Sequence, residues 1–70
     1  KMTKSQRWIV KHFGELVEKY GGKYIAVVDE RIVAIDDSPK EVDRKAREQF
    51  PDEIPSVIHV PTKEALTCIL

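Results

Sequence analysis

The sequence has little that could reinforce a small fold. Cys68 is the only cysteine among 70 residues, so no disulfide can form within the chain. His12, His59 and Cys68 lie far apart, without the spacing of metal ligands. A chain this short buries only about 60% of the surface that its unfolded form exposes. Its stability is therefore marginal unless a disulfide, a metal or oligomerisation adds to it. The remaining way to add to the core is contact with another protein surface.

Other absences exclude whole classes of protein. Twelve basic and twelve acidic residues leave no net charge, which argues against a dedicated nucleic-acid binder. No apolar run approaches the ~18 residues of a membrane span, and no segment has the layout of a secretory signal. The sequence contains no asparagine, and 34% of its residues are charged, which is typical of thermophilic proteins. A single thiol fits a reducing compartment, so we expect a cytoplasmic protein. Since the sequence has no ligand motif and no metal-ligand cluster, we expect neither a cofactor nor a metal.

Residues 3–20 have the pattern of an amphipathic helix. A capping box begins it at Thr3, and Gly21-Gly22 end it. Gly14 inside the helix costs about 1 kcal/mol relative to alanine, so it marks a bend or a close contact. The apolar positions at helical spacing are Ile9, Phe13, Leu16, Val17 and Tyr20.

Two runs rich in β-branched residues predict a β-hairpin. They are Tyr24 to Val28 and Ile32 to Ile35, joined by Asp29-Glu30-Arg31. A tight turn favours glycine at positive φ, so Glu30 costs about 1 kcal/mol there unless the loop is of a longer type.

The second half of the chain predicts a helix and a third strand. Ser38-Pro39-Lys40-Glu41 is a helix start, and Pro51 ends the helix after Phe50. Pairs at i,i+4 are expected along it, Glu41 with Lys45 and Asp43 with Arg47. Ser56 to Val60, between Pro55 and Pro61, reads as an edge strand.

The order is therefore α-β-β-α-β, an α+β domain. We expect one domain over residues 1–70, with a core at 4–61 and an apolar tail at 62–70. The tail is a docking segment, a short helix or a short strand. The sheet is expected to be three-stranded and mainly antiparallel, with the third strand beside the first and two helices on one face.

This arrangement leaves the second face of the sheet open, although both hairpin runs are apolar at nearly every position. Exposed apolar patches of that size mark interfaces. The tail, a second copy or another protein could cover the patch. The predicted interface residues are Tyr24, Ala26, Val28, Val33, Ile35, Leu66, Ile69 and Leu70.

A basic stripe lies on the first helix. Lys4, Arg7 and Lys11 fall within about 60° of one another at 100° per residue, and Trp8 lies beside them. Such a stripe with an aromatic residue can grip phosphates and stack a base. The plainer interpretation is a solvated face, because acidic residues continue the stripe, and a tryptophan at the edge of the core.

No catalytic constellation appears in the sequence. Asp36-Asp37 are neighbours on a strand and point in opposite directions, which favours a role at the turn and the following helix start over acid-base catalysis. His12 and His59 have no nucleophile near them in sequence, and Cys68 has no basic cluster that would lower its pKa. We therefore do not expect an enzyme.

The central residues resemble a family of short prokaryotic domains, common in archaea. Its pattern is a tryptophan, here Trp8, followed by Leu-Val-x-Lys-Tyr-x-Gly-Lys-Tyr-x-Ala-Val-Val-Asp, here residues 16–29. The resemblance extends over residues 8–61 and ends at Val60-Pro61. It implies a small module of unknown function, sometimes encoded near retropepsin-like proteases. Glu30 replaces the usual glycine after the aspartate.

The leading hypothesis is a non-enzymatic protein-interaction or assembly module, such as a regulator or adaptor. It would use the second sheet face and the tail, and its partner is a second copy or another protein. The alternative is a nucleic-acid-binding accessory protein that uses the basic face of the first helix. No membrane role is expected.

Overall fold

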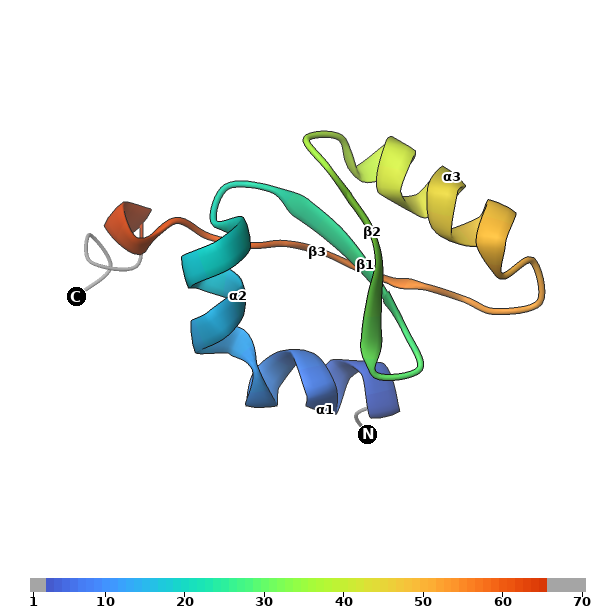
Figure 1. Cartoon of the computed structure of the whole chain (residues 1–70), viewed down its shortest axis with the longest axis horizontal. Coiled ribbons are helices and arrows are strands. Elements are labelled where there is room, and N and C mark those ends of the chain that lie inside the picture. Colours follow the sequence, from blue (N-terminus) through green and yellow to red (C-terminus); the bar gives the residue numbers. More distant parts are fainter. Residues whose placement is uncertain (1–2, 66–70) are drawn as a thin grey trace.

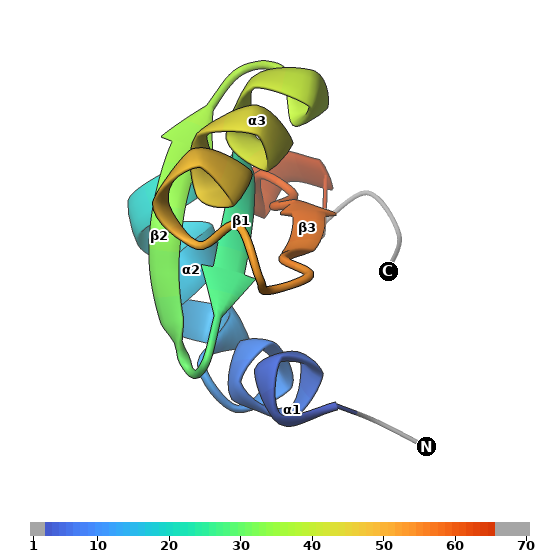
Figure 2. The same cartoon turned by 90° about the vertical axis from the view of Figure 1, so that its right-hand side faces the viewer.

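The chain folds around a three-stranded sheet whose central strand is β1 (Figure 1). The computed structural model describes residues 3–65. The elements in chain order are α1 (Lys4–Lys11), α2 (Phe13–Tyr20), β1 (Tyr24–Val28), β2 (Arg31–Asp36), α3 (Pro39–Gln49) and β3 (Ser56–His59). The strand order is β2-β1-β3, and both pairs are antiparallel (Figure 2). The α+β class and the place of the third strand beside the first are confirmed.

The N-terminal helix predicted over residues 3–20 is divided at His12. His12 has φ −104° and ψ 14°, and the chain turns there between α1 and α2 (Figure 1). The predicted capping box is confirmed, because the Thr3 hydroxyl accepts from the Gln6 N–H at 3.1 Å. Gly14 makes no close contact, since a Cβ there would meet no atom within 4 Å. The break therefore lies two residues before the glycine that indicated it.

Gly21 and Gly22 lead from α2 into β1 and lie beside the end of β3. A Cβ at Gly21 would lie 2.8 Å from the Val17 carbonyl oxygen, and Gly22 has φ 87°. The Gly22 N–H donates to the Val60 carbonyl at 2.7 Å, and the Val60 N–H donates to the Lys23 carbonyl at 2.8 Å. Glycine is needed here because the chain passes close to a carbonyl and then adopts a left-handed conformation.

Helices cover both faces of the sheet, so the prediction of two helices on one face was wrong. Successive residues of β1 point to opposite faces. Ile25 and Val27 pack with α1 and α2, whereas Ala26 packs with α3. Figure 1 shows α3 on the far side of the strands from α1 and α2. The second face that the sequence left open is therefore the α3 face.

Small side chains let α3 come close to the sheet. The buried residues on this face are Ala26, Ala34, Val42 and Ala46. Three alanines leave little side-chain volume between helix and strands, so the thin apolar stripe of α3 is enough to close the face. The other cluster is larger, and its buried members are Ile9, Leu16, Val17, Ile25, Val27 and Val60.

A bulge sets which residues of β2 face which helix. Ala26 lies opposite Ala34 but Val27 lies opposite Ile32, so Val33 has no direct partner in β1. Beyond the bulge Ile35 lies opposite Ile25. Ile35 thus belongs to the face of α1 and α2, not to the face on which the sequence placed it.

The hairpin turn has two residues, Asp29 and Glu30. Their φ angles are 48° and 65°, and Arg31 is already the first residue of β2. Two central residues at positive φ are typical of the tight turn that fits the twist of a hairpin. The tight-turn alternative of the sequence analysis is therefore confirmed.

Burial of α3 on the sheet can be tested with two valines. Val42 of α3 is fully buried, whereas Val10 of α1 is 61% exposed. We expect Val42→Ala to lower the free energy of unfolding by about 2 kcal/mol, because it removes buried methyl groups and leaves a cavity. Val10→Ala should change it by less than about 0.5 kcal/mol. Urea unfolding measures both, and equal losses would contradict the cover by α3.

The strained turn offers a stabilising substitution. We expect Glu30→Gly to raise the free energy of unfolding by about 1 kcal/mol, because glycine adopts positive φ without the steric cost to an L-residue. The change also removes a long ion pair of 3.8 Å between Lys4 and Glu30. Glu30→Ala is the control, since it removes the same carboxylate and keeps the strain. Thermal unfolding that finds Gly no more stable than Ala would contradict the turn assignment.

Candidate functional site

The structure separates the residues predicted to form an interface. Ala26 and Val28 are 0% and 4% exposed, so they are core residues that no partner can contact. Tyr24 and Val33 are half-buried and pack against the α3 cluster. Ile35 is 38% exposed, on the opposite face. Within residues 3–65 the second face therefore has no open patch of the kind predicted, and an interface role for Tyr24, Val33 and Ile35 stays a prediction.

The apolar tail lies mostly outside the described residues, and Leu66, Ile69 and Leu70 are among those not described. Residues 63–65 are helical, and the Thr62 hydroxyl accepts from the Ala65 N–H at 3.0 Å. This is the contact expected of a residue that begins a helix.

The Asp36-Asp37 pair is used at the start of α3. One Asp36 oxygen accepts from the N–H groups of Asp37 and Ser38, at 2.7 and 3.2 Å. The other accepts from Lys45 at 2.8 Å, and Asp37 pairs with Lys23 at 2.9 Å. The Lys45 hydrogen bond, followed by the two backbone donors, holds the pKa of Asp36 below its usual range. The two carboxylates face different cations, which agrees with the structural role expected of them.

Ser38 is at the N-cap of α3, but its side chain makes no capping hydrogen bond. Asp36 accepts from the Ser38 N–H, the donor that Glu41 would need, and the capping box predicted with Glu41 is absent. Glu41 instead pairs with Arg44 at 2.7 Å, and not with Lys45. The predicted pair of Asp43 with Arg47 is confirmed at 3.0 Å.

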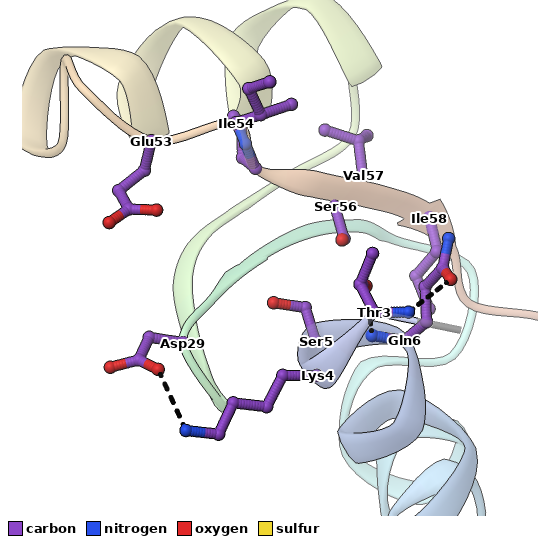
Figure 3. Close-up of a pocket in the computed structure, with 11 residues that line it drawn as sticks. Thr3, Lys4, Ser5, Gln6, Asp29, Glu53, Ile54, Ser56, Val57 and Ile58 are labelled. Atoms are coloured by element: carbon purple, nitrogen blue, oxygen red, sulfur yellow. Dashed lines mark hydrogen bonds and ion pairs between the residues drawn. The ribbon is translucent and has the colours of Figure 1, made fainter. Parts of the chain in front are cut away.

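A groove of about 740 Å³ runs beside β3 (Figure 3). One wall is the first turn of α1, from Thr3 to Gln6, and Asp29 lies at one end. The other wall is formed by every residue from Glu53 to Ile58. Alternate residues of a strand point to opposite faces, so a hollow lined by consecutive residues follows the strand's edge.

Main-chain groups point away from the sheet along the outer edge of β3. The N–H and C=O of Val60 both bond toward β1, at Lys23 and Gly22. Since these groups alternate in direction along a strand, the groups of Val57 and His59 point outward. Within residues 3–65 no hydrogen bond engages those outward groups. Ile54, just before the strand, is 84% exposed.

The structure places the basic stripe of α1 beside a pair of rings. Lys4 is 3.8 Å from carboxylate oxygens of both Asp29 and Glu30. Arg7 and Lys11 form no ion pair in the described part of the chain. The Trp8 and His12 rings have centroids 4.7 Å apart and are tilted by 36°. All four predicted nucleic-acid residues, Lys4, Arg7, Trp8 and Lys11, line one hollow.

Other kinds of site find no support in the described residues. Between residues 3 and 65 no group of three His, Cys, Asp or Glu side chains could hold a metal ion. No described helix is both long and apolar enough to cross a membrane. His59 stacks on Tyr24 with ring centroids 4.6 Å apart, which gives it a packing role.

Fold and surface together define a small α+β domain whose grooves lie at the edge of a helix-covered sheet. A family model matches residues 15–63, so the chain belongs to the family of unknown function DUF5678. The predicted resemblance to a family of unknown function is thereby confirmed. No curated protein and no solved structure matched the chain. The matched residues include the whole sheet and α3, whereas α1 lies before them.

The β3 groove and Ile54 were missed in the sequence analysis. The prolines on either side of β3 predicted that it is an edge strand. The groove itself depends on α1 crossing near the start of β3, a contact between residues about fifty positions apart. Local patterns carry no signal for such a contact.

Asp36 should make stability sensitive to acid. Its pKa is lowered in the folded chain, so its stabilising effect is present above the ordinary carboxyl pKa of about 4 and is lost as the pH falls through the folded value. We expect Asp36→Asn to be less stable than the wild type at pH 7 and to lose less stability between about pH 4 and pH 2. Urea unfolding across that range checks this. Asp52→Asn, at an exposed site without an ion pair in the described chain, is the control and should follow the wild type.

Proposed function

We propose that the protein is a non-enzymatic interaction module that binds an extended segment of a partner protein along the outer edge of β3. The observation that carries the proposal is the set of outward N–H and C=O groups of Val57 and His59 on the edge of β3, together with the groove that follows this edge from Glu53 to Ile58. A peptide that adds to a sheet edge gains main-chain hydrogen bonds there, and side-chain pockets provide specificity.

The walls of the groove favour a particular kind of segment. Ile54 is 84% exposed, so an apolar side chain of the partner would bury it. Lys4 is already 3.8 Å from Asp29, which leaves Glu53 without an ion pair in the described residues. A basic residue of the partner would therefore be favoured at the Glu53 end.

The prolines on either side of β3 limit the length of the added strand. Pro55 and Pro61 have no N–H to donate, and β3 itself has only four residues. A short edge between prolines resists the open-ended pairing that leads to aggregation. We infer a short linear segment as the occupant, in preference to a second copy paired along a long edge. A cytoplasmic setting and a regulator or adaptor role fit such a module.

The test uses nine-residue peptides selected from a random phage-displayed library against the immobilised chain. We expect apolar sequences with a lysine or arginine, and we expect the amides of Val57 and His59 to exchange more slowly when a peptide is bound. Ile54→Asp should weaken binding at least tenfold, because a charge replaces the apolar contact. Val10→Asp is the matched control at another exposed aliphatic side chain and should bind normally.

Two results would contradict the proposal. One is selected peptides that leave the Val57 and His59 amides unprotected. The other is a stable dimer, measured by light scattering over a hundredfold concentration range, in which those amides are already protected. The second result would assign the edge to a second copy of the chain.

A further inference from the structure

Two hollows meet at the Trp8 and His12 rings, on a surface other than the β3 edge. One has a volume of about 440 Å³ and the other about 200 Å³, and both residues line both hollows. The rings therefore form a ridge between two adjacent depressions. The other lining residues are Lys4, Arg7, Lys11 and Glu30 in the larger hollow, and Glu15, Leu16, Lys19, Tyr20, Arg31 and Ile32 in the smaller one.

Positive charge is concentrated on this surface although the chain as a whole is neutral. Five cationic side chains and two anionic ones line the two hollows, whereas the chain has twelve of each sign. One of the two acids, Glu30, already lies 3.8 Å from Lys4. Elsewhere acids are neutralised locally, as where Arg44 bridges Glu41 and Glu48 on α3. A surface with uncompensated charge of one sign attracts the opposite sign.

Three of the cations are available to a ligand. In the described part of the chain Arg7, Lys11 and Lys19 make no ion pair. Arg31 lines the smaller hollow, but its guanidinium lies over the Phe50 ring at the end of α3, 5.6 Å from the centroid, and so is directed away from Trp8 and His12. The available cations lie on both sides of the ring pair, because Arg7 and Lys11 line one hollow and Lys19 the other.

The ring at the centre of these charges is held in place. Trp8 is half-buried and packs against the core cluster that contains Ile9 and Leu16. Its contact with His12 restricts it further. A fixed aromatic face between cations is what binds single-stranded nucleic acid, where bases stack and phosphates lie in a positive groove.

We infer that this surface binds single-stranded nucleic acid, with a base on the Trp8–His12 ridge and the flanking phosphates in the two hollows. The site is separate from the β3 edge, and only Lys4 lines both. An acidic peptide could pair with the cations, but it has no base to stack on the Trp8 ring. A protein with both surfaces would bring a nucleic acid and a partner protein together.

The experiment uses the intrinsic fluorescence of Trp8, the only tryptophan of the chain, and a twelve-residue oligothymidylate. We expect the emission to be quenched on binding at low salt. With three phosphate contacts, one each for Arg7, Lys11 and Lys19, the logarithm of the affinity should fall with the logarithm of the salt concentration with a slope of about −2. Thymidine monophosphate should bind far more weakly, because it engages a single phosphate.

Matched variants locate the site. Lys11→Ala should lower the affinity several-fold and make the salt slope shallower by about 0.7. Lys40→Ala removes the same side chain from an exposed site on α3, where Lys40 forms no ion pair within residues 3–65, and should bind like the wild type. Trp8→Leu, followed by anisotropy of a labelled oligonucleotide, should lower the affinity about tenfold or more. Its thermal unfolding is measured to show that it folds.

Four outcomes would overturn the inference. The first is no binding at low salt. The second is binding without quenching, at an affinity that a heparin oligosaccharide of equal charge reproduces, which would indicate a polyanion contact that ignores the ring. The third is equal loss in Lys11→Ala and Lys40→Ala. Acidic peptides that bind as tightly as the oligonucleotide would also overturn it, since they present no base to Trp8.

Discussion

Burial of β1 on both faces is the constraint on which the rest of the structure depends. Residues 25–27 are fully buried and Val28 nearly so, although β1 has only five residues. A strand with apolar residues at successive positions needs cover above and below. The chain supplies it with α1 and α2 on one side and α3 on the other. Because β1 is the central strand, β2 and β3 are edge strands. The surfaces open to ligands therefore lie around the rim of the sheet.

The two proposed sites share a physical origin in α1. Its first turn forms a wall of the β3 groove, and its middle carries the ring and cations of the second surface. The match to DUF5678 begins at residue 15, so α1 lies outside the matched segment. The sheet and α3 are thus the part shared with the family. Each proposed site therefore combines residues of α1 with residues of the matched segment, such as Glu53 to Ile58 in the groove and Lys19 in the smaller hollow.

Neutral composition concealed the distribution of charge. On α3, acids and bases alternate at helical spacing and neutralise one another, as Asp43 and Arg47 do. On α1, cations such as Arg7 and Lys11 pair with no acid among the described residues. The net charge of the whole chain is zero despite this difference between the two surfaces. Electrostatic attraction acts at the surface where a ligand approaches, so the local excess matters more than the sum.

The sequence by itself determined the local features, because these depend on near neighbours. The Thr3 cap, the glycine stop after Tyr20 and the edge strand between prolines were predicted and are present, and the hairpin turn is the tight one of the two alternatives that the sequence left open. Only the tertiary structure decided which face α3 covers, where the long first helix breaks and where the bulge turns Ile35 to the other face. These features depend on how closely α3 can approach the sheet where both carry alanines, and on contacts between segments far apart in the sequence. The residue pattern of a single segment contains no information on either the approach or the contacts.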